Sequence, residues 1–202
     1  MLLLKQIIKV CVVGLLLGGC SGMFAPVAMP EIQNYQITPA GGDIKAASCA
    51  RVNKESTLQI TRMRAEAPYE TTKMFYSKGQ YQLDSYSYNQ WAAFPTQMLS
   101  YAVFQKVMQS CIYKSVVSGE FMTVSNYTLN TKLLELKQII NGDSSVVNLI
   151  IIAQLIENKS DSVIRSKTFV VKANSSPNPK AYVVSVNQAT SEFLAQLTNW
   201  LQ

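Results

Sequence analysis

The chain has 202 residues and no histidine, and its 18 basic and 12 acidic residues give a formal net charge of +6. The absence of histidine removes the commonest general base and metal ligand, so Ser–His–Asp sites, Cys–His sites and histidine-containing zinc sites are excluded. The basic residues are scattered and the few carboxylates lie apart, so we expect no enzyme, no metal, no cofactor and no nucleic-acid partner.

The amino-terminal segment has the layout of a secretory signal. Lys5 and Lys9 supply a positive start, an apolar run covers residues 10–17, and two glycines precede Cys20. The last four residues resemble a bacterial lipobox, in which the cysteine receives a diacylglyceryl group. The alternatives are a secreted protein with a chance cysteine, or an uncleaved anchor helix. The apolar run is shorter than the roughly 20 residues that a membrane span needs.

The signal divides the chain into three parts. We predict a lipoprotein signal peptide over residues 1–19, the lipidated Cys20 with a flexible tether over residues 20–32, and a single domain over residues 33–202. The domain is large enough to bury a hydrophobic core. Its two cysteines, Cys49 and Cys111, can form a disulfide in an oxidising compartment, or remain as free buried thiols.

The first half of the domain alternates short strands with one helix. Residues 34–39 and 57–64 have strand character, and residues 74–77 and 80–85 flank Lys78-Gly79 as a hairpin. Thr96 can cap a helix over residues 97–113. Its core-facing stripe repeats every four residues. That stripe is formed by Leu99, Val103, Val107 and Cys111.

The second half predicts longer elements. A short strand is expected over residues 120–125, and long strands over 127–140, 146–156 and 162–173, with a tight turn at Asn141-Gly142-Asp143. In the last strand, Val163, Phe169 and Val171 share a face if the strand is regular. A final helix over residues 180–201 has one apolar stripe. This order predicts an α+β fold, a mainly antiparallel or mixed sheet with two long helices packed on one face.

An ordered set of short motifs spans nearly the whole domain. The motif residues are Met74, Tyr81, Tyr86, Asn89, Trp91, Pro95, Met98 and Leu99, with Asn34–Pro39 before them and Phe169, Phe193 and Trp200 after them. In order and spacing the set resembles the auxiliary lipoproteins of bacterial ABC-type transport systems, and in particular the PqiC/YmbA type. In those proteins arginine commonly precedes the tryptophan of the motif, whereas Gln90 stands there in this chain.

The aromatic stretch that carries this motif, residues 86–95, has two interpretations. In one it is a structural corner, in which Trp91 and Phe94 are buried under the first helix and Pro95 sets the helix entry. In the other, Tyr86, Asn89, Trp91 and Pro95 contact a partner or a lipid, because exposed tyrosine and tryptophan are enriched at interfaces. The corner is the favoured interpretation.

The resemblance implies a non-enzymatic accessory subunit that is anchored in the membrane by lipid. Its partners would be the ATPase, the permease and the MCE-domain protein of an ABC-type system that moves lipids between the inner and outer membranes, and self-association is left open. Ser21 after the lipidated cysteine favours the periplasmic face of the outer membrane over the inner membrane. The alternative is a stand-alone periplasmic lipoprotein that binds lipid or another hydrophobic ligand, which would need an apolar cavity.

Overall fold

The computed structural model describes residues 30–38, 49, 54–121 and 124–202. Three long antiparallel strands are its longest sheet elements. β7 (Tyr127–Asn141) pairs with β8 (Ser144–Glu157), and β8 pairs with β9 (Ser162–Ser175). The Asn141-Gly142-Asp143 turn between β7 and β8 is confirmed. Gly142 has a φ of 59°, which glycine adopts without a steric penalty.

Within the described residues, shorter strands extend these three into a mixed sheet of nine strands. β2 (Lys54–Ile60), β3 (Arg64–Ala65) and β4 (Lys73–Ser77) each pair with β7 in parallel. The remaining strands add to these. β5 (Asp84–Trp91) pairs antiparallel with β4, while β1 (Gln33–Tyr35) and β6 (Tyr113–Ser118) pair in parallel with β5 and β2.

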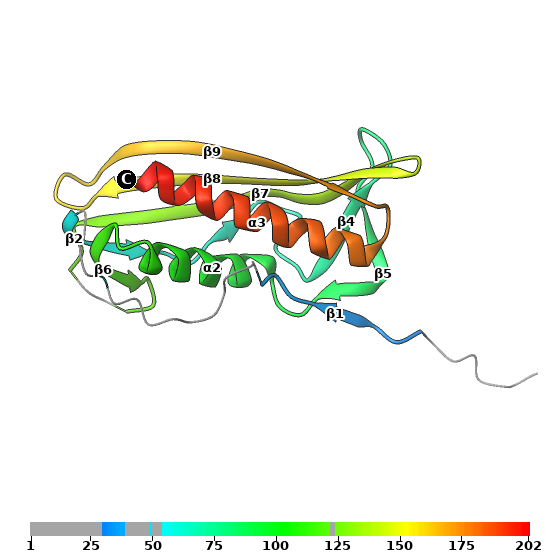
Figure 1. Cartoon of the computed structure of the whole chain (residues 1–202), viewed down its shortest axis with the longest axis horizontal. Coiled ribbons are helices and arrows are strands. Elements are labelled where there is room, and N and C mark those ends of the chain that lie inside the picture. The colour runs from blue at the N-terminus through cyan, green and yellow to red at the C-terminus, as the bar shows by residue number, and fades with distance from the viewer. Residues whose placement is uncertain (1–29, 39–48, 50–53, 122–123) are drawn as a thin grey trace, which may run out of the picture. The chain divides into compact units, whose positions relative to one another are not determined.

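Both helices, α2 (Pro95–Gln109) and α3 (Pro179–Leu201), lie on the same face of the sheet (Figure 1). The apolar stripe of α3 packs on β8 and β9, where Phe193 meets Phe169 edge-on at 5.4 Å between ring centroids. The predicted α+β class with two helices on a mixed sheet is confirmed. Residues Ile32–Gln202 form one compact unit, whereas the predicted signal, Cys20 and nearly all of the tether lie outside the described residues.

Two expectations around α2 are wrong. The helix begins at Pro95 with Phe94 as its N-cap residue, and no side chain caps it, so Thr96 is not the cap. Proline at the first helical position supplies the required φ without needing its missing N–H. The helix also ends at Gln109 and not at residue 113, because Cys111 has a φ of 53°, which an α-helix cannot accommodate.

The chain after Cys111 returns to the sheet earlier than expected. The strand lies before Gly119, over Tyr113–Ser118, and not over residues 120–125. The β-branched pair Val116-Val117 suits this position because it packs beside β2. Gly119 then passes so close to the end of β2 that a Cβ there would lie 2.9 Å from the Cα of Thr61.

Two strands differ in detail from the prediction. The β4–β5 hairpin is present, but β5 starts at Asp84 and continues through the aromatic stretch to Trp91. In β9 the register shifts opposite Leu155 and Ile156. This shift places Val163 outward, with 52% of it exposed, whereas Phe169 and Val171 are buried as expected. A bulge of this kind reverses the side-chain alternation beyond it.

The two cysteines of the domain are joined. Cys49 and Cys111 form a disulfide with a Cα–Cα distance of 5.6 Å, and 62 residues separate them in sequence. This separation is in the ordinary range for a disulfide, and closing so long a loop stabilises the fold by about 4 kcal/mol in the chain-entropy model.

We expect neither Cys49 nor Cys111 to react with an alkylating agent when the exported protein is denatured without reductant. Intact-protein mass spectrometry measures this, and the same sample treated with reductant should gain two alkyl groups. Two alkyl groups gained without reductant would show that the bridge does not form in the cell.

Candidate functional site

The predicted motif residue Trp91 is an interior side chain. It is 1% exposed, and its ring meets Tyr182 of α3 edge-on at 5.7 Å between centroids. Pro95 is also buried, in the first turn of α2. The expectation that Phe94 is buried with them is wrong, because Phe94 is 45% exposed. As the N-cap residue it stands where the chain turns from β5 into α2, and its side chain leaves the core there.

Tyr86 belongs to a buried polar network. Its hydroxyl donates to Oε1 of Gln138 at 2.7 Å, and Gln138 is fully buried. The Gln138 amide in turn donates to three oxygens at the ends of β8 and β9. These acceptors are Ser145 Oγ, Ser175 Oγ and Ser176 O. The network joins β5 to β7, β8 and β9, so its effect is to fix the end of the sheet.

Asn89 holds β1 to β5. Its Oδ1 accepts a hydrogen bond from the Tyr35 hydroxyl at 3.2 Å, beside the backbone register of Gln33 with Asn89. The four motif residues Tyr86, Asn89, Trp91 and Pro95 therefore lie close along one strand and the helix start that follows it. Three of them contact this chain's own strands and helix: Tyr86 contacts β7, Asn89 contacts β1 and Trp91 contacts α3.

The buried tyrosines carry the largest shifts in pKa. Burial raises the pKa of Tyr69 and of Tyr113 to about 12, and it raises that of the fully buried Tyr182 well above the ordinary value of 10. These hydroxyls stay neutral at physiological pH and act as packing groups. In the described part of the chain, no three Cys, Asp or Glu side chains are grouped so as to hold a metal ion.

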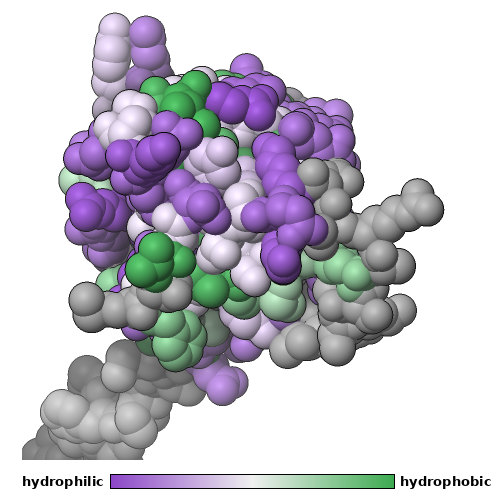
Figure 2. Space-filling model, turned by 90° about the vertical axis from the view of Figure 1, so that its left-hand side faces the viewer, coloured by the Kyte–Doolittle hydropathy of each residue, from purple (hydrophilic) through white to green (hydrophobic). Residues whose placement is uncertain are grey.

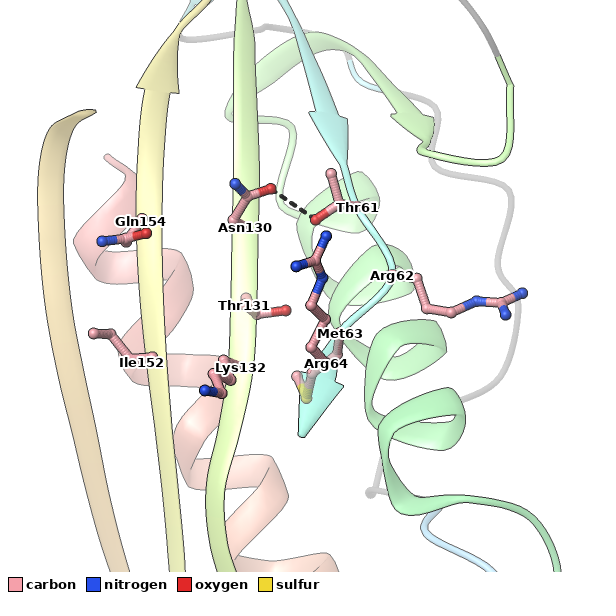
Figure 3. Close-up of a pocket in the computed structure, with 9 residues that line it drawn as sticks. All are labelled: Thr61, Arg62, Met63, Arg64, Asn130, Thr131, Lys132, Ile152 and Gln154. Atoms are coloured by element: carbon pink, nitrogen blue, oxygen red, sulfur yellow. Dashed lines mark hydrogen bonds between the residues drawn. The ribbon is translucent and has the colours of Figure 1, made fainter. Parts of the chain in front are cut away.

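A hollow of about 470 Å³ opens beside β7, in the gap between the two strands β2 and β3 that pair with the same edge of β7 (Figure 3). β2 pairs with β7 up to Ile60–Leu129, and β3 resumes at Arg64–Lys132. Between them Met63 turns into the core, 2% exposed, and its N–H bonds to the Ser100 hydroxyl of α2 at 2.8 Å. This detour leaves the hollow between the two strands.

Basic and polar side chains line this hollow together with Met63 and Ile152. In Figure 3 the Arg64 guanidinium lies between β7 and the Thr61–Arg62 segment, while that of Arg62 points away from β7. Sequence reasoning missed the hollow because Arg62 and Arg64 are merely two basic residues in a strand pattern. The full lining is Thr61, Arg62, Met63, Arg64, Asn130, Thr131, Lys132, Ile152 and Gln154.

Aromatic side chains make a second surface over α2. Tyr101 is 54% exposed and Phe121 is 68% exposed, and both line a hollow of about 400 Å³ together with Phe104. A further hollow of about 400 Å³ shares Tyr101 and includes Met98. Figure 2 views the end of the sheet near β2 and β6, where hydrophilic side chains dominate and hydrophobic ones form smaller patches in the upper and lower parts. We call Tyr101, Phe104 and Phe121 the α2 aromatic surface.

No described helix is long and apolar enough to cross a membrane. A comparison with curated proteins finds no match. Among solved structures, the fold is similar to the crystal structure of protein XCC0632 from Xanthomonas campestris, with a TM-score of 0.67 and 18% identity over 85% of this chain and 91% of that chain. It is also similar to the crystal structure of an uncharacterized protein, with a TM-score of 0.64 and 13% identity over 86% of this chain and 100% of that chain.

These likenesses at low identity concern the fold alone. The sequence itself matches a family model over residues 35–198, which runs from the end of β1 through β9 and α2 to the last turn of α3 and includes the β5–α2 motif. Most of the residues that carry the resemblance seen in the sequence lie within this match. The chain therefore belongs to the family described as the ABC-type transport auxiliary lipoprotein component.

Proposed function

We propose that this chain is a non-enzymatic, membrane-anchored accessory subunit that docks onto an ABC/MCE-type transporter moving lipids between the inner and outer membranes. Its family is an auxiliary lipoprotein component of ABC-type transport. The observation that carries the proposal is the filled interior of the domain, which leaves the surface as the place where the protein acts.

The interior is packed with large side chains from both layers. Four of them are each at most 1% exposed, and they meet in two pairs between the sheet and α3, Trp91 with Tyr182 and Phe169 with Phe193. Such packing occupies the volume that a lipid carrier would keep free for acyl chains. The hollows beside β7 and over α2 open at the surface. This arrangement favours a docking subunit over the stand-alone carrier.

The α2 aromatic surface is the part of the domain best suited to a protein partner. Exposed tyrosine and phenylalanine are costly in water and are enriched at the centres of interfaces. Tyr101 lies between two hollows that could receive partner side chains. We assign the contact with the MCE-domain protein or permease to this surface, and not to the motif residues Tyr86, Asn89, Trp91 and Pro95.

The anchor completes the proposal. Lipidation at Cys20 would attach the amino terminus to a membrane, and several acyl chains together hold stably because each buried CH₂ contributes about 0.8 kcal/mol. With Ser21 next to it, we place the anchor in the periplasmic face of the outer membrane. The subunit would then tether the transporter to that membrane, alone or as a self-associated assembly.

The distinction between docking subunit and carrier can be measured through bound lipid. We expect the full-length protein, purified in a non-ionic detergent and washed, to retain far less than one phospholipid per chain, because its core has no room for acyl chains and a lipid held only at the surface exchanges with detergent. Organic extraction followed by quantitative mass spectrometry gives the ratio. A near-equimolar phospholipid content that resists washing would favour the carrier and contradict the docking subunit.

A further inference from the structure

The hollow beside β7 contains a cation and a hydroxyl that have no partner in the described part of the chain. Arg64 is exposed, no carboxylate among the described residues lies within 4.0 Å of its guanidinium, and Figure 3 places that guanidinium in the hollow. The other two basic residues of the lining are paired: Arg62 with Glu120 at 2.9 Å, and Lys132 with Glu66. The free positive charge of the hollow is therefore that of Arg64.

Thr131 is the second unpartnered group. Its side chain is buried, with 5% exposed, yet its hydroxyl takes part in none of the hydrogen bonds among the described residues. Its neighbour Thr61 differs, because the Thr61 hydroxyl donates to Asn130 Oδ1 at 2.9 Å. Figure 3 shows the Thr131 oxygen on the side of β7 that faces Arg64. This hydroxyl is not among the fully buried polar atoms without a partner in the described part of the chain, so water or a ligand in the hollow can reach it.

We propose that this hollow binds a phosphodiester oxyanion, the group found in phospholipid headgroups. A guanidinium presents two parallel N–H donors that match two oxygens of a phosphate, and the Thr131 hydroxyl is available for a third contact. A carboxylate has two oxygens, and the guanidinium alone would use both. The single net charge of a phosphodiester also equals the single unpaired charge of Arg64.

Apolar side chains beside the hollow identify a lipid as the source of the phosphodiester. Ile152 lines the hollow, and Ile150, two residues before it, lies on the same outward face of β8. Val170 lies opposite Ile150 in β9 and is 53% exposed. This row gives the glycerol and the first acyl carbons an apolar surface next to the charged group. The lipid source rests on the proposed function, whereas the anion site rests on the geometry of the hollow.

The test uses the full-length protein in a non-ionic detergent and a soluble headgroup, glycerophosphoglycerol, as the probe in equilibrium dialysis. Replacing Arg64 with glutamine should weaken binding by about tenfold or more, because a charge-assisted contact is lost. Thr131→Val, which keeps the shape and removes the hydroxyl, should weaken it by about threefold or more. The matched control is Arg62→Gln, which removes an arginine that points away from β7 and should change binding by less than about twofold.

Inorganic phosphate and acetate are compared with glycerophosphoglycerol in the same dialysis experiment. The proposal predicts that both bind more weakly than the diester, and that all variants keep the circular dichroism spectrum of the parent. Equal losses for Arg62→Gln and Arg64→Gln would indicate diffuse surface charge and overturn the site. Phosphate or acetate binding as tightly as the diester would overturn the headgroup assignment, and so would an absence of diester binding. None of these outcomes depends on whether the protein docks onto a transporter.

Discussion

Trp91→Ala should lower the free energy of unfolding by about 3–5 kcal/mol, the usual cost of truncating a fully buried tryptophan. The indole is 1% exposed and fills the space between β5 and Tyr182 of α3, so the variant would leave a cavity that the rigid sheet cannot close. Urea unfolding of the full-length protein, followed by far-ultraviolet circular dichroism so that the signal does not depend on tryptophan, measures the change in the free energy of unfolding.

Phe94→Ala is the matched control for this prediction. Phe94 lies three residues after Trp91 but is 45% exposed, so its truncation should cost no more than about 1 kcal/mol. Comparable losses for the two variants would contradict the placement of Trp91 in the core. If Trp91→Ala retained full stability but lost transporter binding, the motif would instead be a partner contact.

Cys20→Ala should abolish acylation and remove the protein from the lipid-anchored fraction, because only the thiol of that residue can accept the diacylglyceryl group. Metabolic labelling with a fatty-acid analogue measures the effect. We expect the label to fall to background, since the variant cannot receive the acyl chains that anchor the parent.

The other cysteine of the signal segment provides the control. Cys11→Ala changes the apolar run without touching the lipobox, so the variant should be labelled and anchored like the parent. Undiminished label in the Cys20→Ala protein would refute the lipoprotein assignment. Loss of label in both variants would point to failed export, and comparison of precursor sizes on a gel identifies that case.

The long elements could be predicted from the sequence because their patterns are strong. β7, β8 and α3 carry sustained apolar periodicity, and the glycine of the two-residue turn between β7 and β8 suits a tight hairpin. These elements account for the α+β class. The order of the shorter strands could not be predicted, because alternation within a strand does not say which strand lies beside it. The parallel pairing of β2, β3 and β4 with β7 is such a case.

Local errors have local causes. The positive φ of Cys111 ends α2 while its apolar stripe is still continuing, and a register shift turns Val163 outward. Gln138 was overlooked although a signal exists: it occupies an inward position of β7, two residues after Leu136, where a polar side chain requires buried partners. The hollow beside β7 has no comparable signal, because it arises from the gap between β2 and β3.

The central claim is that this lipoprotein is a docking subunit of a lipid transporter. The most direct measurement is purification of the tagged full-length chain from native membranes in mild detergent, followed by mass spectrometry of the proteins that remain bound. We expect recovery of the MCE-domain protein, with its permease and ATPase, and loss of these components when Tyr101 is changed to a charged residue. Recovery of the chain without any transporter component, but with near-equimolar lipid, would contradict the account.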